Sequence, residues 1–124
     1  MTTETHQGAA PAMKLRLRDD LRAAMTGRRS AEVAILRALL GAIDQAEAVA
    51  AVERGREYVS LRFGDPAVEV PRRRLSAGEV EEVVRKERDE LRNAADDYAR
   101  LGQAEAAAAR ALQADLVGRY LEPA

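Results

Sequence analysis

Apolar side chains recur every three or four residues along most of this chain, and that spacing is typical of one face of an amphipathic α-helix. Four stretches follow it, over residues 13–25, 30–52, 77–101 and 103–120. The first two and the last two are separated by only a few residues, which favours antiparallel pairing within each pair. The pattern therefore predicts an all-α fold, with residues 13–124 forming a single bundle domain of about four helices.

The ends of the first two helices are marked by glycine and by a capping side chain. Gly27 is expected to take the left-handed conformation that ends the first helix, and Ser30 to cap the second. Gly41 falls in the middle of the second helix, where either a close helix crossing or plain tolerance explains it. The seam of each helix is the line of residues that we expect to face the core. The predicted seams are Leu17, Leu21 and Ala24 or Met25 in the first helix, and Val33, Leu36, Leu39, Leu40, Ile43 and Glu47 in the second.

The third helix has the clearest start in the chain. Ser76 and Glu79 form a Ser-x-x-Glu capping box, in which each side chain accepts a hydrogen bond from the other residue's backbone N–H. Gly102 is expected to end this helix, and because the fourth follows at once, the two should pack as a long antiparallel hairpin. The predicted seams are Val80, Val84, Leu91, Ala94, Tyr98 and Leu101, interrupted at Glu87, and then Ala109, Leu112, Leu116 and Tyr120.

Residues 53–75 break the helical pattern and are predicted to form an insertion between the two hairpins. Strand-favouring residues from 58 to 63, a turn signal at 64–66 and an alternating stretch up to residue 70 are typical of a short β-hairpin or an ordered loop. A basic patch follows, which is either a solvated run or a phosphate-binding site. Its members are Arg72, Arg73 and Arg74.

Composition narrows the classes of function. The chain of 124 residues has no Cys and one His, which excludes thiol catalysis, disulfides and the usual Cys and His metal sites. His6 lies within residues 1–12, a polar stretch that we expect to be a disordered tail. We therefore interpret this imidazole as a surface group rather than a ligand or base, and we expect no cofactor.

Charge and hydropathy bear on the partners and the cellular location of the protein. Charged residues make up 33% of the chain, yet they nearly cancel to a net charge of −1, so we expect no uniformly basic, DNA-binding surface. No apolar run approaches the roughly 20 residues that span a bilayer, and the polar N-terminal stretch lacks a signal peptide. The sequence thus predicts a cytoplasmic protein that does not bind membranes.

A search for catalytic motifs finds none. Gly-rich phosphate loops, the dinucleotide fingerprint, the nucleophile elbow and paired-His helix motifs are all missing. Carboxylates share a face of the third helix, but interleaved Arg and Lys favour a solvated, ion-paired surface over a di-metal site. Tyr98 and Tyr120 lie on seams, which leaves Tyr58, near Phe63, as an aromatic for base stacking. The carboxylates are Glu79, Glu82, Glu87, Glu90, Asp96 and Asp97.

Several short motifs occur in an order that is informative as a set. In the first half they are Asp20-Leu21 with Ala24-Met25, then Ile35-Leu36-Arg37, then Ile43 and Glu47. In the second half they are Leu75-Ser76 with Glu79-Val80, then Val84-Arg85-Lys86-Glu87, Tyr98, and Tyr120-Leu121 with Pro123. This order resembles the YqeY-like proteins of the GatB/YqeY family, over about residues 15–123 without the insertion.

The resemblance implies a helical bundle that the family follows with a small helical domain. That second domain is similar to the tail of the B subunit of the tRNA-dependent amidotransferase, which is associated with tRNA. We expect this chain to carry the bundle portion only. It departs from the family's pattern at Asp89-Glu90-Leu91, where a basic Lys-Gln-Arg stretch is usual, and at Gln113, where Glu is expected.

These observations support two hypotheses of different classes. The first is a non-catalytic helical protein-interaction module that binds a protein partner or a second copy of itself, motivated by the alanine-rich fourth helix. The alternative is a tRNA- or RNA-associated accessory protein related to the amidotransferase, a carbon–nitrogen ligase. An amidotransferase-type enzyme rests on the resemblance alone. The candidate residues for binding nucleic acid or a partner are Arg28, Arg29, Tyr58, Arg72, Arg73 and Arg74.

Overall fold

The computed structural model describes residues 8–61 and 75–122, and the side chains of these residues apart from 54 and 56–61. These ranges contain four α-helices, a final 3₁₀ turn and no strand, which confirms an all-α bundle. The elements are α2 (Ala9–Thr26), α3 (Ser30–Leu61), α4 (Ala77–Arg100), α5 (Ala104–Gly118) and the 3₁₀ turn η1 (Arg119–Leu121).

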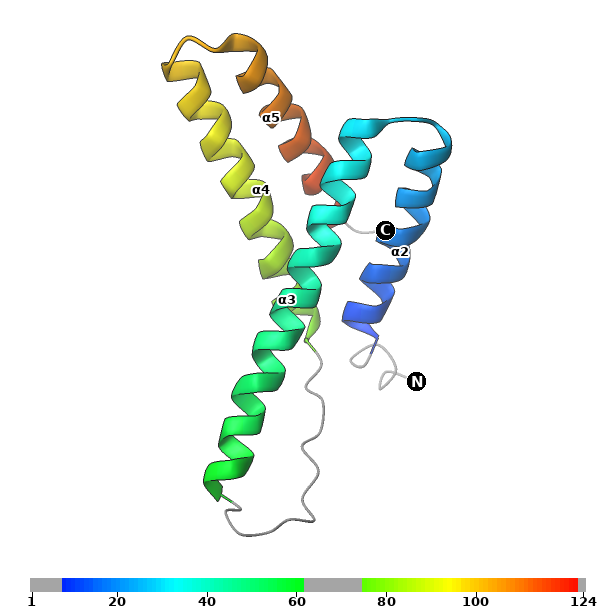
Figure 1. The fold of residues 1–124 in the computed structure, drawn as a ribbon, viewed down its shortest axis with the longest axis vertical. Helices are drawn as coiled ribbons and strands as arrows, with labels where there is room; N and C mark the ends of the chain where they lie inside the picture. Colours follow the sequence, from blue (N-terminus) through cyan, green and yellow to red (C-terminus); the bar gives the residue numbers. More distant parts are fainter. Residues whose placement is uncertain (1–7, 62–74, 123–124) are drawn as a thin grey trace.

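The helices form two antiparallel hairpins that together make a V (Figure 1). α2 packs along the first half of α3, and α4 packs along α5 over most of its length. The hairpins meet where α5 and η1 end, and they separate toward the α2–α3 and α4–α5 turns. We call the α4–α5 hairpin the arm. The predicted pairing of the last two helices is therefore confirmed.

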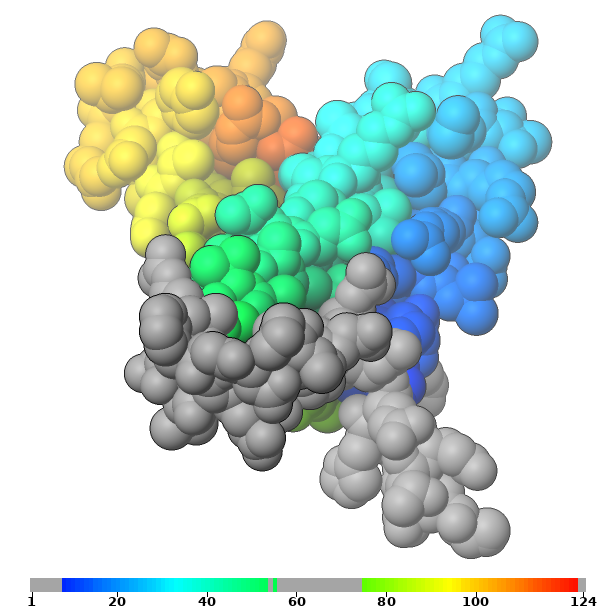
Figure 2. All heavy atoms as spheres, turned by 60° about the horizontal axis from the view of Figure 1, so that its bottom comes forward, coloured from blue at the N-terminus to red at the C-terminus, as the bar shows by residue number. Residues whose placement is uncertain are grey.

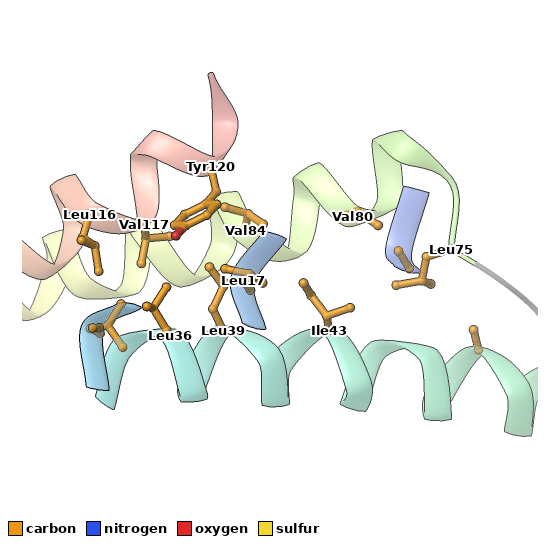
Figure 3. Close-up of a cluster of buried hydrophobic side chains, with 14 residues drawn as sticks. Leu17, Leu36, Leu39, Ile43, Leu75, Val80, Val84, Leu116, Val117 and Tyr120 are labelled. Carbon is orange, nitrogen blue, oxygen red and sulfur yellow. The ribbon is translucent and has the colours of Figure 1, made fainter. Parts of the chain in front are cut away.

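The core lies where the two hairpins meet, and every helix contributes to it (Figure 3). Leu17 from α2 and Leu39 from α3 lie close to Val84 of α4 and Val117 of α5, and each of these side chains is at most 1% exposed. Full burial of an aliphatic side chain of this size stabilises a fold by about 1.5–3 kcal/mol. The base of the V therefore holds the two hairpins together.

The turns around α4 follow the sequence prediction. The backbone N–H of Glu79 donates to the Ser76 hydroxyl at 3.1 Å, and the backbone N–H of Ser76 donates to the Glu79 carboxylate at 2.8 Å. Both halves of the capping box are thus present. Gly102 has a φ of 75°, the left-handed conformation that glycine adopts without a steric cost.

The turn between α2 and α3 differs from the prediction in two places. Gly27 keeps a right-handed φ of −80°, and the left-handed residue is Arg28, with a φ of 57°. The cause is that α2 runs on through Thr26, so the reversal falls one residue later. Ser30 is the first helical residue rather than the cap, because the Arg29 carbonyl already accepts from the N–H of Val33 at 3.0 Å.

Both α2 and α3 are longer than their patterns indicate. α2 begins at Ala9, inside the stretch predicted to be a tail, and Ala10 is fully buried. Residues 53–61 continue α3 instead of starting the insertion, and they include Tyr58. Extending an existing helix adds a hydrogen bond for each residue fixed, which outweighs a weak local strand preference. The rest of the predicted insertion, residues 62–74, lies outside the described residues.

Gly41 has a simple explanation in the structure. A Cβ atom built at this position would meet no heavy atom within 4 Å. The close helix crossing is therefore not found around Gly41, and plain tolerance of glycine on an exposed helix face accounts for it.

Candidate protein-interaction surface

The predicted binding residues occupy different parts of the fold. Arg28 and Arg29 lie exposed at the α2–α3 turn, where the Arg29 side chain donates to Glu32 at 3.0 Å. Tyr58 belongs to the last turns of α3, and its side chain is outside the described set. Arg72, Arg73 and Arg74 also lie outside the described residues. Their roles as binding residues therefore stay predictions.

The length of α3 separates two of these groups. At 1.5 Å of rise per residue, the backbone of Tyr58 lies about 43 Å along the helix from that of Arg29. Arg29 directly precedes Ser30, the first residue of α3, and Tyr58 lies in the same continuous helix, which fixes this separation. A single short ligand cannot reach both ends of α3, so Arg28 and Arg29 do not share one contact site with Tyr58.

Part of the carboxylate set on α4 is ion-paired, as the sequence suggests. Arg85 donates to Glu82 at 2.5 Å, and Arg100 pairs with Asp97. Glu79 is engaged in the capping box. Within the described ranges, no group of three or more Asp, Glu or His side chains is arranged to hold a metal ion.

The predicted seam of α5 divides into two parts. Leu116 and Tyr120 are buried as expected, but Ala109 is exposed and Leu112 has 69% of its surface exposed. Val117 is buried at the base of the V instead. The prediction that Ala109 and Leu112 face the core is therefore wrong. They form an apolar face on the part of α5 that no helix in the described ranges covers.

This face borders a hollow between α5 and the start of α3, which we call the notch. Its volume is about 320 Å³. Figure 2 shows α4 and the start of α3 diverging, with α5 in the space between them. Alanine and leucine make most of its wall, and one acidic and one basic side chain stand among them. The lining is Ala31, Glu32, Ala109, Leu112, Gln113, Leu116 and Arg119.

A hydrogen bond between distant parts of the chain fixes the closed end of the notch. The Tyr120 hydroxyl donates to the Asp20 carboxylate, and the Arg16 guanidinium lies 4.5 Å from the centre of the Tyr120 ring. Burial, and next the hydrogen bond to Asp20, raises the pKa of Tyr120 well above its usual value, so the phenol stays protonated. These contacts hold η1, with Arg119, against α2. The sequence gives no local signal for a contact between residues 100 positions apart.

A second cleft, of about 500 Å³, lies between the later part of α3 and the start of α4. Its floor is apolar and includes Ala46 and Val83, while carboxylates such as Glu82 and Glu87 stand around it. Burial, then the neighbouring Glu90, raises the pKa of Glu87, and Lys86 opposes the shift. Glu53 and Leu75 line this cleft, and the side chains of residues 54 and 56–61 and all of residues 62–74 are not described. The notch lies at the opposite end of the bundle, and the side chains named in its lining all belong to the described residues.

Comparison with known proteins adds no relative to this picture. No family model, curated protein or solved structure gives a significant match to the chain. The resemblance to the YqeY-like proteins therefore stays a prediction from the order of motifs. A search of the described helices finds none with the length and apolar character needed to cross a membrane.

Proposed function

We propose that this protein is a non-catalytic helical protein-interaction module that binds a helix of a partner in the notch. The observation that carries the proposal is the exposure of Leu112, at 69%, on the wall of a hollow between two helices. Exposed apolar side chains gathered beside a concave surface are typical of interaction sites. Burying one leucine of this kind contributes about 1.5–3 kcal/mol.

The residues around Leu112 suit a helix better than a loop or a small ligand. Ala108 and Ala109 are exposed on the same side of α5, and their short side chains let a second helix approach closely. Glu32 and Arg119 stand in the lining with opposite charges, and such charges set the orientation of a partner more than they add affinity.

The test is affinity purification from the native cell with three forms of the chain, each treated with and without nuclease. These are the wild type, Leu112→Glu in the notch, and Leu15→Glu as a matched control. Leu15 is 59% exposed on α2, and its neighbour Lys14 pairs with Asp44 and Glu47, well away from Glu32 along α3. The control therefore changes the surface charge in the same way without touching the notch.

We expect the wild type and Leu15→Glu to retain the same proteins, Leu112→Glu to lose them, and nuclease to make no difference. Retention of the same proteins by all three forms would contradict a role for the notch. Loss of the captured proteins on nuclease treatment would favour the alternative function, an RNA-associated accessory protein, over this one.

A further inference from the structure

We infer that the helix that occupies the notch is α5 of a second copy, so that two chains form an antiparallel dimer with its two-fold axis at Leu112. This inference rests on the proposed function and names its partner. In such a dimer each α5 lies against the other and enters the space between the partner's arm and α3. The argument rests on the order of charged and apolar residues along the exposed face of α5.

The face of α5 is apolar around Leu112 and carries opposite charges at equal distances before and after it. Residues equally far before and after Leu112 meet when two copies of the helix pack antiparallel about it. Ala108 lies four residues before Leu112 and Leu116 four after, so a small side chain meets a large one. Glu105 lies seven residues before and Arg119 seven after, so an acid meets a base.

Arg119 directly follows α5 with right-handed helical backbone angles, a φ of −62° and a ψ of −27°, so these residues share one side of the helix. At 100° of rotation per residue, steps of four and seven residues bring a side chain back to within about 40° of Leu112. Ala108, Leu112, Glu105 and Arg119 are all exposed. Leu116 is 7% exposed and shows its remaining surface to the notch. These residues form a stripe on the side of α5 that is open to a partner. We define the stripe as Glu105, Ala108, Leu112, Leu116 and Arg119.

The two charged residues at the ends of the stripe lack partners within the described part of the chain. Neither Glu105 nor Arg119 forms an ion pair there, although Arg85, Arg88 and Arg100 of α4 are paired with carboxylates. Two antiparallel copies would give each of these residues an opposite charge, twice in one dimer. A parallel arrangement would put Glu105 against Glu105 and Arg119 against Arg119, which costs free energy. The charges thus select the antiparallel dimer.

Leu112 at the axis and the alanines beside it fit this arrangement. Two Leu112 side chains would meet at the axis and shield each other from water. Ala108 and Ala109 are exposed and short, which lets the two helices approach to the spacing of 8–10 Å that packed helices adopt.

The experiment is sedimentation equilibrium of the full chain with a charge-reversal pair. In the Glu105→Arg variant both ends of the stripe are basic. In the Arg119→Glu variant both ends are acidic. Each variant alone repels its own copy at both ends, so we expect its dimer dissociation constant to rise about tenfold over wild type. An equimolar mixture restores both opposite-charge pairs, and we expect it to dimerise about as tightly as the wild type.

Leu112→Glu and Leu15→Glu complete the set. We expect Leu112→Glu to weaken the dimer by about a hundredfold, because two copies of the side chain leave the interface. Leu15→Glu should leave it unchanged. All four substituted positions are exposed, and circular dichroism confirms that each variant is folded.

Two results would overturn the dimer. One is a wild-type chain that stays monomeric up to about 1 mM, the range of weak association. The other is a mixture of the two charge variants that dimerises no better than either alone. If these occur while Leu112→Glu still loses the proteins captured from the cell, the dimer is wrong and the proposed function stands. If that capture is also insensitive to Leu112→Glu, both fail.

Discussion

Val117 and Leu112 are aliphatic side chains on the same helix, five residues apart, and they have opposite surroundings. Val117 is 1% exposed and Leu112 is 69% exposed. Val117 lies at the base of the V, where side chains from α2, α3 and α4 surround it (Figure 3). Leu112 lies five residues nearer the α4–α5 turn, on the wall of the notch, and the two hairpins diverge toward that turn (Figure 1). The two regions of α5 differ in what faces them and not in their own chemistry.

The comparison shows where a helical pattern stops being informative. Periodicity indicates that a helix has an apolar side, but it does not say how far the neighbouring helix extends along it. α3 starts at Ser30 and α2 ends at Thr26, and the two hairpins diverge toward this turn. The apolar side of α5 therefore continues beyond the stretch that the neighbouring helices cover. We regard this uncovered part as the functional one.

The largest expected effect contrasts a buried leucine at the base with the exposed one in the notch. Leu39 is 1% exposed, so Leu39→Ala removes contacts from both hairpins and leaves a cavity. We expect the free energy of unfolding to fall by about 2–5 kcal/mol. Leu112→Ala should change it by less than about 0.5 kcal/mol in the monomer. Urea denaturation at low protein concentration measures both. Equal losses would show that Leu112 is covered in solution.

The second contrast concerns the two seam tyrosines. Tyr120→Phe removes the hydroxyl that donates to Asp20, and we expect a loss of about 1.5 kcal/mol because the bond involves a charged carboxylate. Tyr98→Phe is the matched control on the arm, where Arg110 lies 5.9 Å from the ring centre and the hydroxyl has no partner in the described ranges. It should cost almost nothing. If Tyr120→Phe costs as much in an Asp20→Ala background, where the acceptor is gone, as in the wild type, the hydrogen bond is contradicted.

The third contrast compares the two serines at helix starts. Ser76 accepts the Glu79 N–H at the start of α4, which enters the base of the V. We expect Ser76→Ala to cost about 1 kcal/mol, the usual value of an N-cap. Ser30 begins α3 beside the notch and has no cap bond to any residue described, so Ser30→Ala should lie within about 0.5 kcal/mol of wild type. Thermal unfolding distinguishes them. A similar loss at Ser30 would restore it as a cap.

The smallest effect is a pH dependence at Glu87, which is half-buried on α4 between the base and the open part of the arm. Burial raises the pKa of Glu87 in the folded state, so ionising it at neutral pH costs stability. Glu87→Gln should therefore be slightly more stable than wild type at pH 7. The difference should vanish below about pH 3.5, where the carboxyl is mostly protonated in both states.

Unfolding measured across this pH range tests the sign of the effect. Asp96→Asn, which removes an exposed carboxylate of α4 outside the notch, serves as the control and should change stability little at any pH. If Glu87→Gln is less stable than wild type at pH 7, the charged form of Glu87 makes a favourable contact in the folded protein, and the assigned cause is wrong.

Local chemistry made part of this fold predictable. The Ser76 and Glu79 capping box, the turn at Gly102 and the pairing of α4 with α5 each depend on residues close in sequence. The missed features depend on distant ones. No local pattern shows that α3 continues to Leu61, or that Tyr120 reaches Asp20. Of the candidate binding residues, only Arg28 and Arg29 have side chains that the structure places, and both are exposed at one turn.

The sequence by itself determined that this protein is helical and where its clearest caps lie, because propensity, periodicity and capping act over a few residues. It also contained the Glu105, Ala108, Leu112, Leu116 and Arg119 stripe, in the right order. Only the tertiary structure decided that this stripe has two environments, buried near Leu116 and open at Leu112. The physical reason is that burial depends on which neighbours reach a side chain in space. The divergence of the two hairpins determines how far along α5 those neighbours extend.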